Sequence, residues 1–343
     1  MSIQTYMTIK WILYGWCVLV LFLVGMSPAR AESSSEVTAL MNLLAIQPKE
    51  LARLEAGKTI SFDIAENNDK ELAAGVIMYL PAKPSKLLEY IDQKGLANID
   101  TDIVAQGMIP NQPTLQSFEG FVLKPGSNEA RSFLQAKPGS EFNLSTEEFK
   151  LLKNIDTTKN DAASQAYRSL LLQRLESYRQ KGLKGIADYD RGDGMEARPA
   201  DELRVATLAN KVLTRYFPQI YKAWLDYPAP LPPGTEERFF WLNRTVEGRP
   251  TAILGHRILL SYQGAEVMLS RQFYVGHSYN SSQLSIACLP YRDGSLVFYG
   301  NRTFTDQVAG FGSGVKHSIG REQMRGEIVK RLTNLRKLLN KSK

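Results

Sequence analysis

Apolar and polar residues alternate through the last third of the chain, and this alternation predicts four β-strands. The four runs cover residues 252–262, 266–275, 283–289 and 295–303, and short segments rich in Gly, Asn, Ser and Asp separate them. Successive side chains of a strand point to opposite faces of a sheet, and Gly, Asn and Asp are favoured in tight turns. The pattern therefore predicts an antiparallel meander.

A long helix is predicted directly after the meander, over residues 316–341. Its apolar residues recur at the spacing of a helix that buries one face; they are Ile328, Leu332, Leu335 and Leu339. Basic residues occupy many of the other positions. A glycine-rich segment, residues 310–314, precedes the helix and acts as a hinge that lets it fold back.

Two strands and a short helix are predicted near the start of the chain. The strands cover residues 58–64 and 75–80, and an Asn-containing segment joins them as a hairpin. Prolines stop the second strand, after which Ser85 can cap a helix over residues 86–94. A further strand is predicted over residues 99–107.

The middle of the chain is predicted to be mostly helical. Residues 161–181 and 200–217 both carry the periodicity of amphipathic helices, and the acidic segment 188–193 is interpreted as a solvated turn between helices. Prolines crowd residues 227–234 and predict a stiff spacer. We therefore expect a helical insertion, residues 145–225, between strands of one sheet.

The N-terminal segment has the layout of a secretory signal peptide. Lys10 precedes an uncharged apolar run, residues 11–26, and Ala29 and Ala31 occupy the small-residue positions of a cleavage site. Cleavage is expected before Glu32, which would give a periplasmic or secreted protein. The alternative is an uncleaved membrane anchor, because the apolar run approaches the length of about 20 residues that spans a bilayer.

Charge and cysteine content limit the classes of function. Loss of Lys10 and Arg30 with the leader lowers the formal net charge from +7 to +5. This excess is too small to indicate a protein that binds nucleic acid. Only Cys288 remains after cleavage, so no intramolecular disulfide can form and the core alone must stabilise the fold.

The sequence predicts neither a metal site nor a catalytic one. Zinc needs three or four converging ligands, but His256, His277 and His317 are spread along the chain. Cys288 lies in an apolar strand, where a buried and inert thiol is expected. Nucleophile-elbow and phosphate-loop motifs are also missing. We therefore expect a protein that is not an enzyme and needs no cofactor.

The predicted elements follow an order that resembles a known superfamily: strand, strand, short helix, long interruption, meander and long helix. The segments are residues 58–64, 75–82, 84–88, 271–274 and 296–303, together with the helix after Gly314. This order resembles the START-like, helix-grip (SRPBCC) superfamily and secreted bacterial proteins of this type. The resemblance implies a curved antiparallel sheet wrapped around the terminal helix, with a cavity between them. The large helical insertion departs from that pattern.

The expected fold class is α+β, with a curved antiparallel sheet gripping a long C-terminal helix and an inserted helical subdomain. After the signal peptide, residues 1–31, residues 32–144 supply the N-terminal strands and short helix. Residues 145–225 form the insertion, and residues 226–343 supply the meander and the C-terminal helix that complete the START-like domain.

The resemblance implies an exported, non-enzymatic binding or carrier protein for a lipid or other apolar small molecule. The residues expected to line its cavity are His256, Tyr262, Arg271, Phe273, Tyr299 and Arg302. Either arginine could hold an acidic head group through paired hydrogen bonds, or form an ordinary ion pair. The alternatives are an envelope interaction or structural protein with a filled core and, third, a cyclase- or hydrolase-type enzyme. The basic C-terminal helix could also contact an anionic membrane surface.

Overall fold

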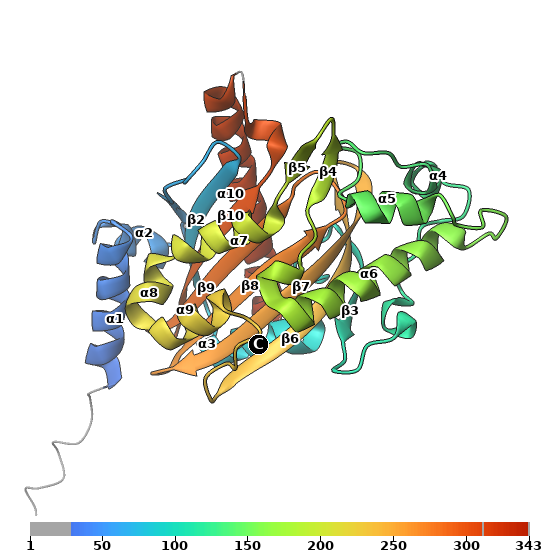
Figure 1. Ribbon diagram of the computed structural model, residues 1–343. Helices are drawn as coiled ribbons and strands as arrows, with labels where there is room; N and C mark the ends of the chain where they lie inside the picture. Colours follow the sequence, from blue (N-terminus) through green and yellow to red (C-terminus); the bar gives the residue numbers. More distant parts are fainter. Residues whose placement is uncertain (1–28, 311, 342–343) are drawn as a thin grey trace, which may run out of the picture.

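An eight-stranded antiparallel sheet forms the centre of the protein (Figure 1). The computed structural model describes residues 29–310 and 312–341. The strand order is β1-β2-β10-β9-β8-β7-β6-β3. The strands are β1 (Ile60–Asp63), β2 (Glu71–Leu80), β3 (Ile103–Ile109), β6 (Thr235–Val246), β7 (Arg249–Tyr262), β8 (Ala265–Val275), β9 (Ser281–Tyr291) and β10 (Gly294–Phe304).

The two ends of the chain meet inside this sheet. Strands β6 to β10 follow one another as a meander, and β2 pairs with β10 along its whole length. Tyr299 of β10 lies opposite Ile286 of β9 on one side and Val76 of β2 on the other. The N-terminal strands and the last strand therefore belong to one continuous, open sheet.

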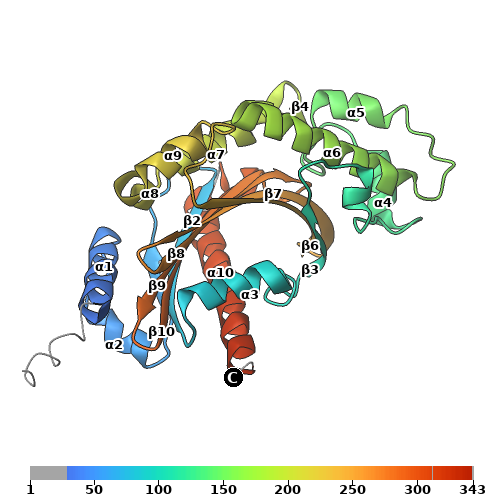
Figure 2. The same cartoon turned by 90° about the horizontal axis from the view of Figure 1, so that it is seen from below.

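The concave face of the sheet holds two helices, α3 (Pro84–Lys94) and α10 (Ser313–Lys341), as Figure 2 shows. The apolar stripe of α10 packs against the sheet, with Ile328, Leu332, Leu335 and Leu339 all buried. Their partners include Met268 and Val297. Burial of this stripe holds the long helix in the curve of the sheet.

The convex face is covered as well, by the other helices (Figure 2). Helix α6 packs over β6–β8, helices α8 and α9 over β7 and β8, and α1 and α2 over β2, β9 and β10. The bounds are α1 (Ala29–Leu43), α2 (Glu50–Glu55), α4 (Asn128–Leu134), α5 (Thr146–Leu152), α6 (Ala162–Lys181), α7 (Pro199–Leu208), α8 (Lys211–Tyr216) and α9 (Pro218–Leu225). Both faces of the sheet are therefore apolar.

The predicted fold class is confirmed: the protein is α+β, with an antiparallel sheet and a long C-terminal helix. The helix predicted over residues 200–217 is wrong in one detail, because it is two helices, α7 and α8. Asn210 separates them, since its side chain accepts a hydrogen bond from the backbone N–H of Leu213 and so caps α8. The predicted acidic turn is a two-stranded hairpin, β4 (Tyr189–Gly192) and β5 (Met195–Ala197).

The proline-rich segment, residues 227–234, packs against the body of the protein. The Tyr227 ring stacks on Tyr178 of α6, with 5.2 Å between the ring centroids. Gly182 ends α6 at φ +59°, and a Cβ at this position would lie 1.6 Å from the carbonyl oxygen of Tyr227. Glycine is therefore required for α6 to end this close to the segment.

The predicted signal peptide lies almost entirely outside the described residues. Residues 29–31, which include the expected cleavage site, begin α1, and cleavage stays a prediction. Within residues 29–310 and 312–341, no helix is both long enough and apolar enough to cross a membrane.

Helix α10 should contribute strongly to stability. We expect Leu332→Ala to lower the free energy of unfolding by about 2–5 kcal/mol, because it removes a buried side chain from the apolar face by which α10 packs on the sheet. Denaturant unfolding followed by circular dichroism measures this. Lys337→Ala, at an exposed position of the same helix, should change stability by no more than about 0.5 kcal/mol. Equal effects of the two substitutions would contradict the packing of α10 described above.

Candidate functional site

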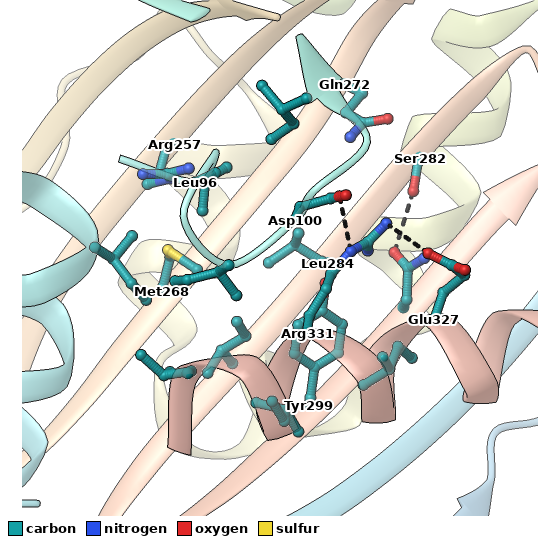
Figure 3. A pocket seen from close by; sticks show the side chains of 18 of the residues that line it. Leu96, Asp100, Arg257, Met268, Gln272, Ser282, Leu284, Tyr299, Glu327 and Arg331 are labelled. Carbon is teal, nitrogen blue, oxygen red and sulfur yellow. Dashed lines mark hydrogen bonds and ion pairs between the residues drawn. The ribbon is translucent and has the colours of Figure 1, made fainter. Parts of the chain in front are cut away.

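A cavity of about 240 Å³ lies between the concave face of the sheet, α3 and α10 (Figure 3). Strands β8, β9 and β10 form its floor, α10 forms one wall, and α3 with the segment leading to β3 forms another. Every second side chain of these strands points to the concave face, and these side chains form the floor of the cavity. The cavity is therefore a product of the sheet's curvature and of the two helices that it holds.

One part of the cavity is apolar. Met268, Ile286, Cys288 and Val297 project from the sheet, and they are met by side chains of α3 and α10. The helical side chains are Leu87, Ile91, Met324, Ile328, Leu332 and Leu335. Such a lining binds hydrocarbon and gives little hold to a charged molecule.

The opposite part of the cavity carries a network of ion pairs. Arg244 Nε lies 3.0 Å from Asp100 Oδ2, and Arg331 Nε lies 2.9 Å from the same oxygen. Glu327 Oε2 is 3.3 Å from an Arg244 nitrogen and 3.7 Å from an Arg331 nitrogen. Burial would raise the pKa of Asp100, but the two guanidinium groups lower it below its ordinary value. The carboxylate therefore stays ionised and holds β6 to α10 through the loop before β3.

Uncharged polar groups complete this end. Tyr279 Oη donates to Gln272 Oε1 at 2.6 Å, and Ser282 Oγ donates to Asn301 Oδ1 at 3.1 Å. All four side chains line the cavity. One further cation, Arg257, lines the cavity outside this network, on the side of Leu96 and Met268 (Figure 3), and its guanidinium lies 4.8 Å from the centroid of the Phe240 ring. The cavity thus has an apolar part and a part rich in hydrogen-bonding groups.

The lining offers little for covalent chemistry. Burial raises the pKa of Cys288 to about 12, so its thiol stays protonated and is a poor nucleophile. Among the described residues, no group of three or more His, Cys, Asp and Glu side chains is placed to hold a metal ion. The arrangement is suited to binding a small molecule by shape and polarity.

Of the six residues predicted to line this cavity, the structure places only Tyr299 there. Its hydroxyl is a hydrogen-bond partner of Arg331. Tyr262 lies at the far end of β7 with 45 % of its surface exposed, and its ring contacts Phe217 at 5.2 Å between centroids. Arg302 points to the convex side and pairs with the buried Glu71.

His256, Arg271 and Phe273 come together, but on the convex face beneath α6 and α9. His256 Nδ1 lies 2.8 Å from Tyr178 Oη, and Nε2 lies 2.9 Å from Glu237 Oε1. Phe273 stacks on the Tyr178 ring with 4.0 Å between centroids.

Arg271 completes this convex cluster and is fully buried. Its guanidinium lies 3.9 Å from the centroid of the Trp224 ring and donates to Trp224 O at 2.7 Å and to Tyr178 Oη at 3.3 Å. The predicted common cavity is therefore wrong for five of the six residues. The alternation did place His256 on a buried apolar face, but both faces are buried, and the residue pattern alone does not identify the face toward α10. Whether any of the six residues binds a ligand stays a prediction.

The charged residues of the cavity were missed by sequence reasoning. Arg331 and Glu327 are four residues apart on α10, beside the buried Ile328 and Leu332. A charged pair at this spacing next to an apolar stripe is a usable signal. Asp100 and Arg244, by contrast, are 144 residues apart, and no local pattern connects them.

No protein-family profile matches the chain, and no curated protein matches it.

His256 of the convex cluster should make the stability of the protein depend on pH. Burial lowers the pKa of His256 from 6.5 to about 4, although the nearby Glu237 carboxylate acts in the opposite direction and raises it. The folded protein therefore prefers the neutral imidazole, and the stability that this group contributes is complete above pH 6.5 and is lost as the pH falls toward 4. The loss should be on the order of 3 kcal/mol, and His256→Gln should abolish this part of the pH dependence of unfolding.

Glu202→Gln is the matched comparison for the pH prediction. Burial raises the pKa of Glu202 to about 6, so this carboxyl adds stability as the pH falls below 6, the opposite sign to His256. Denaturant unfolding of wild type and both variants between pH 4 and pH 7 separates the two groups. A wild-type profile that His256→Gln leaves unchanged would show that the imidazole does not titrate in this way.

Proposed function

We propose that the protein is an exported, non-enzymatic carrier that binds an apolar small molecule or lipid chain between its sheet and its C-terminal helix. The observation that carries the proposal is the cavity itself, in which an apolar lining from α3, α10 and the sheet ends at a cluster of polar groups. A molecule with a hydrocarbon part and one polar end matches this division.

The charges at the polar end favour a ligand that hydrogen-bonds over one that carries a full charge. Arg244, Arg331 and Lys330 pair with Asp100, Asp102 and Glu327, so the cations and carboxylates of the network balance. An extra charge placed beside this network would compete with ion pairs that already exist. Neutral donors and acceptors such as Gln272 and Ser282 remain as partners for a hydroxyl or carbonyl group.

The volume argues for a small ligand or a single chain. Pockets for drug-sized molecules span about 300–1,000 Å³, and the cavity, at about 240 Å³, lies just below that range. A single acyl chain or a compact isoprenoid fits this description. The helix-grip arrangement is compatible with the START-like superfamily, and membership of that superfamily, like export through the N-terminal leader, is part of the proposal.

Native mass spectrometry with lipid extraction tests the carrier function on protein purified from its own envelope. We expect a stoichiometric apolar molecule to accompany the wild type. Cys288→Phe should remove it, because the new ring points into the apolar part of the cavity, whereas Cys288→Ala should retain it.

Leu284→Phe provides a second filling substitution, from a side chain that is only half-buried because it faces the cavity. A clean apo mass for the wild type, with no thermal shift in a panel of neutral and anionic lipids, would refute the carrier function. An envelope interaction protein would then be the better account. A ligand that Cys288→Phe and Leu284→Phe both retain would place binding elsewhere in the protein.

A further inference from the structure

A second and larger hollow, of about 470 Å³, lies on the convex face of the sheet. Helix α1 lines it through leucines such as Leu40, and the α7–α8 segment lines it through Val212 and neighbouring residues. The end of β1 and the segment after it form a third side, through Phe62 and Ile64. Figure 1 shows α1 and α8 side by side at the left of the molecule, and Figure 2 shows them on the convex side of the sheet. We call this hollow the convex groove.

The convex groove exists because small residues occupy the floor between the two helical layers. Ser285, Ala287 and Gly300 lie in β9 and β10, at the middle of the sheet, yet each is only half-buried. Protein interiors are close-packed, so partly exposed backbone and small side chains at the centre of a covered sheet mark space that residues 29–310 and 312–341 do not fill. The volume is within the range of about 300–1,000 Å³ found for small-molecule sites.

The lining of the convex groove changes in polarity along the strands. The register of β9 and β10 pairs Ala287 with Phe298, then Ser285 with Gly300, then Gln283 with Arg302. The floor therefore passes from apolar, through small, to polar over five residues of β10, a length of about 13 Å. The apolar end lies with Val267 and the α1 leucines.

Two cations line the convex groove, Arg302 and the exposed Lys211. Arg302 is held by the buried Glu71 and by the carbonyl of Ala65 at 3.0 Å, so its position is fixed and its charge already has a partner. The one carboxylate of the lining, Asp63, pairs with Arg325 of α10. The exposed Lys211 is therefore the cation of the lining that complements a negative group.

We propose that the convex groove is a second ligand site, which takes a single-chain anionic amphiphile. The hydrocarbon chain lies on Ala287 and Phe298 between α1 and α8, and the acidic group lies toward Lys211 and Arg302. The site is separate from the proposed carrier cavity, because the two lie on opposite faces of β9: Cys288 points into the carrier cavity and Ala287 into the convex groove.

Because Ala287 and Cys288 point to opposite faces, each site can be filled without the other in the full chain. The probes are dodecanoate and its uncharged analogue dodecanol, and binding is measured by titration calorimetry and native mass spectrometry. Both probes also fit the proposed carrier cavity, so the measurements are made in a Cys288→Phe background, in which that cavity is filled. Cys288→Phe should still bind dodecanoate, and the double variant Cys288→Phe/Ala287→Phe should not. Lys211→Gln should weaken dodecanoate by about two- to fivefold, the size of one exposed charge contact, and leave dodecanol unaffected.

Val212→Trp, on the helical wall, fills the same groove without altering the sheet and supports the test should Ala287→Phe fail to fold. In the Cys288→Phe background, retention of dodecanoate after both Ala287→Phe and Val212→Trp would overturn the proposed site. Equal binding of dodecanol and dodecanoate in that background would overturn the anionic ligand class. Dimers that form without probe and dissociate in Ala287→Phe would show instead that a second copy of the chain covers the groove. Cys288→Phe tests the carrier cavity, and Ala287→Phe tests the convex groove. The two proposals can therefore fail independently.

Discussion

Burial of both faces of one sheet is the constraint on which the rest of the structure depends. A strand such as β2, with nearly every side chain buried, needs an apolar layer on each side. Helices α3 and α10 supply one layer, and α1, α2 and the α6–α9 segment supply the other. The hydrophobic effect sets this requirement but does not demand perfect filling. The concave cavity and the convex groove lie where a helical layer does not fill the space against the curved sheet.

The polar groups inside the protein are arranged differently on the two faces. On the concave side, Asp100 stays ionised between Arg244 and Arg331, and each charge of this network has an opposite charge near it. On the convex side, Arg271 is fully buried against the Trp224 ring and the Tyr178 hydroxyl, and no carboxylate of the described residues forms an ion pair with it. Aromatic faces and hydroxyl oxygens replace an anion there, which is the more demanding environment for a cation. The convex cluster fixes α6 and α9 on the sheet, whereas the concave network borders open space.

Sequence reasoning predicted most strands of the large sheet, though not β6, and it predicted α10, because local periodicity records these elements directly. It could not choose between two apolar faces, and so it put His256, Arg271 and Phe273 beside Tyr299 although the sheet separates them. Nor could it foresee that Asp100 meets Arg244 and Arg331, since that contact depends on how α10 lies in the curve. The break at Asn210 was visible in principle, because Asn is a favoured cap. Elements follow from the neighbours of a residue along the chain, and sites follow from neighbours in space.

The pairing of β2 with β10 has a consequence for how the chain is made. Ser295 at the start of β10 donates to the carbonyl of Ala82 just after β2, and 213 residues separate the two. During synthesis from the N-terminus, the apolar β2 therefore has no permanent neighbour on that side until almost the whole chain has emerged. Long-range antiparallel pairing of this kind forms slowly and leaves strand edges open in the meantime. The nascent protein needs shielding for most of its synthesis, and a chain cut short before β10 keeps an unprotected strand that invites aggregation.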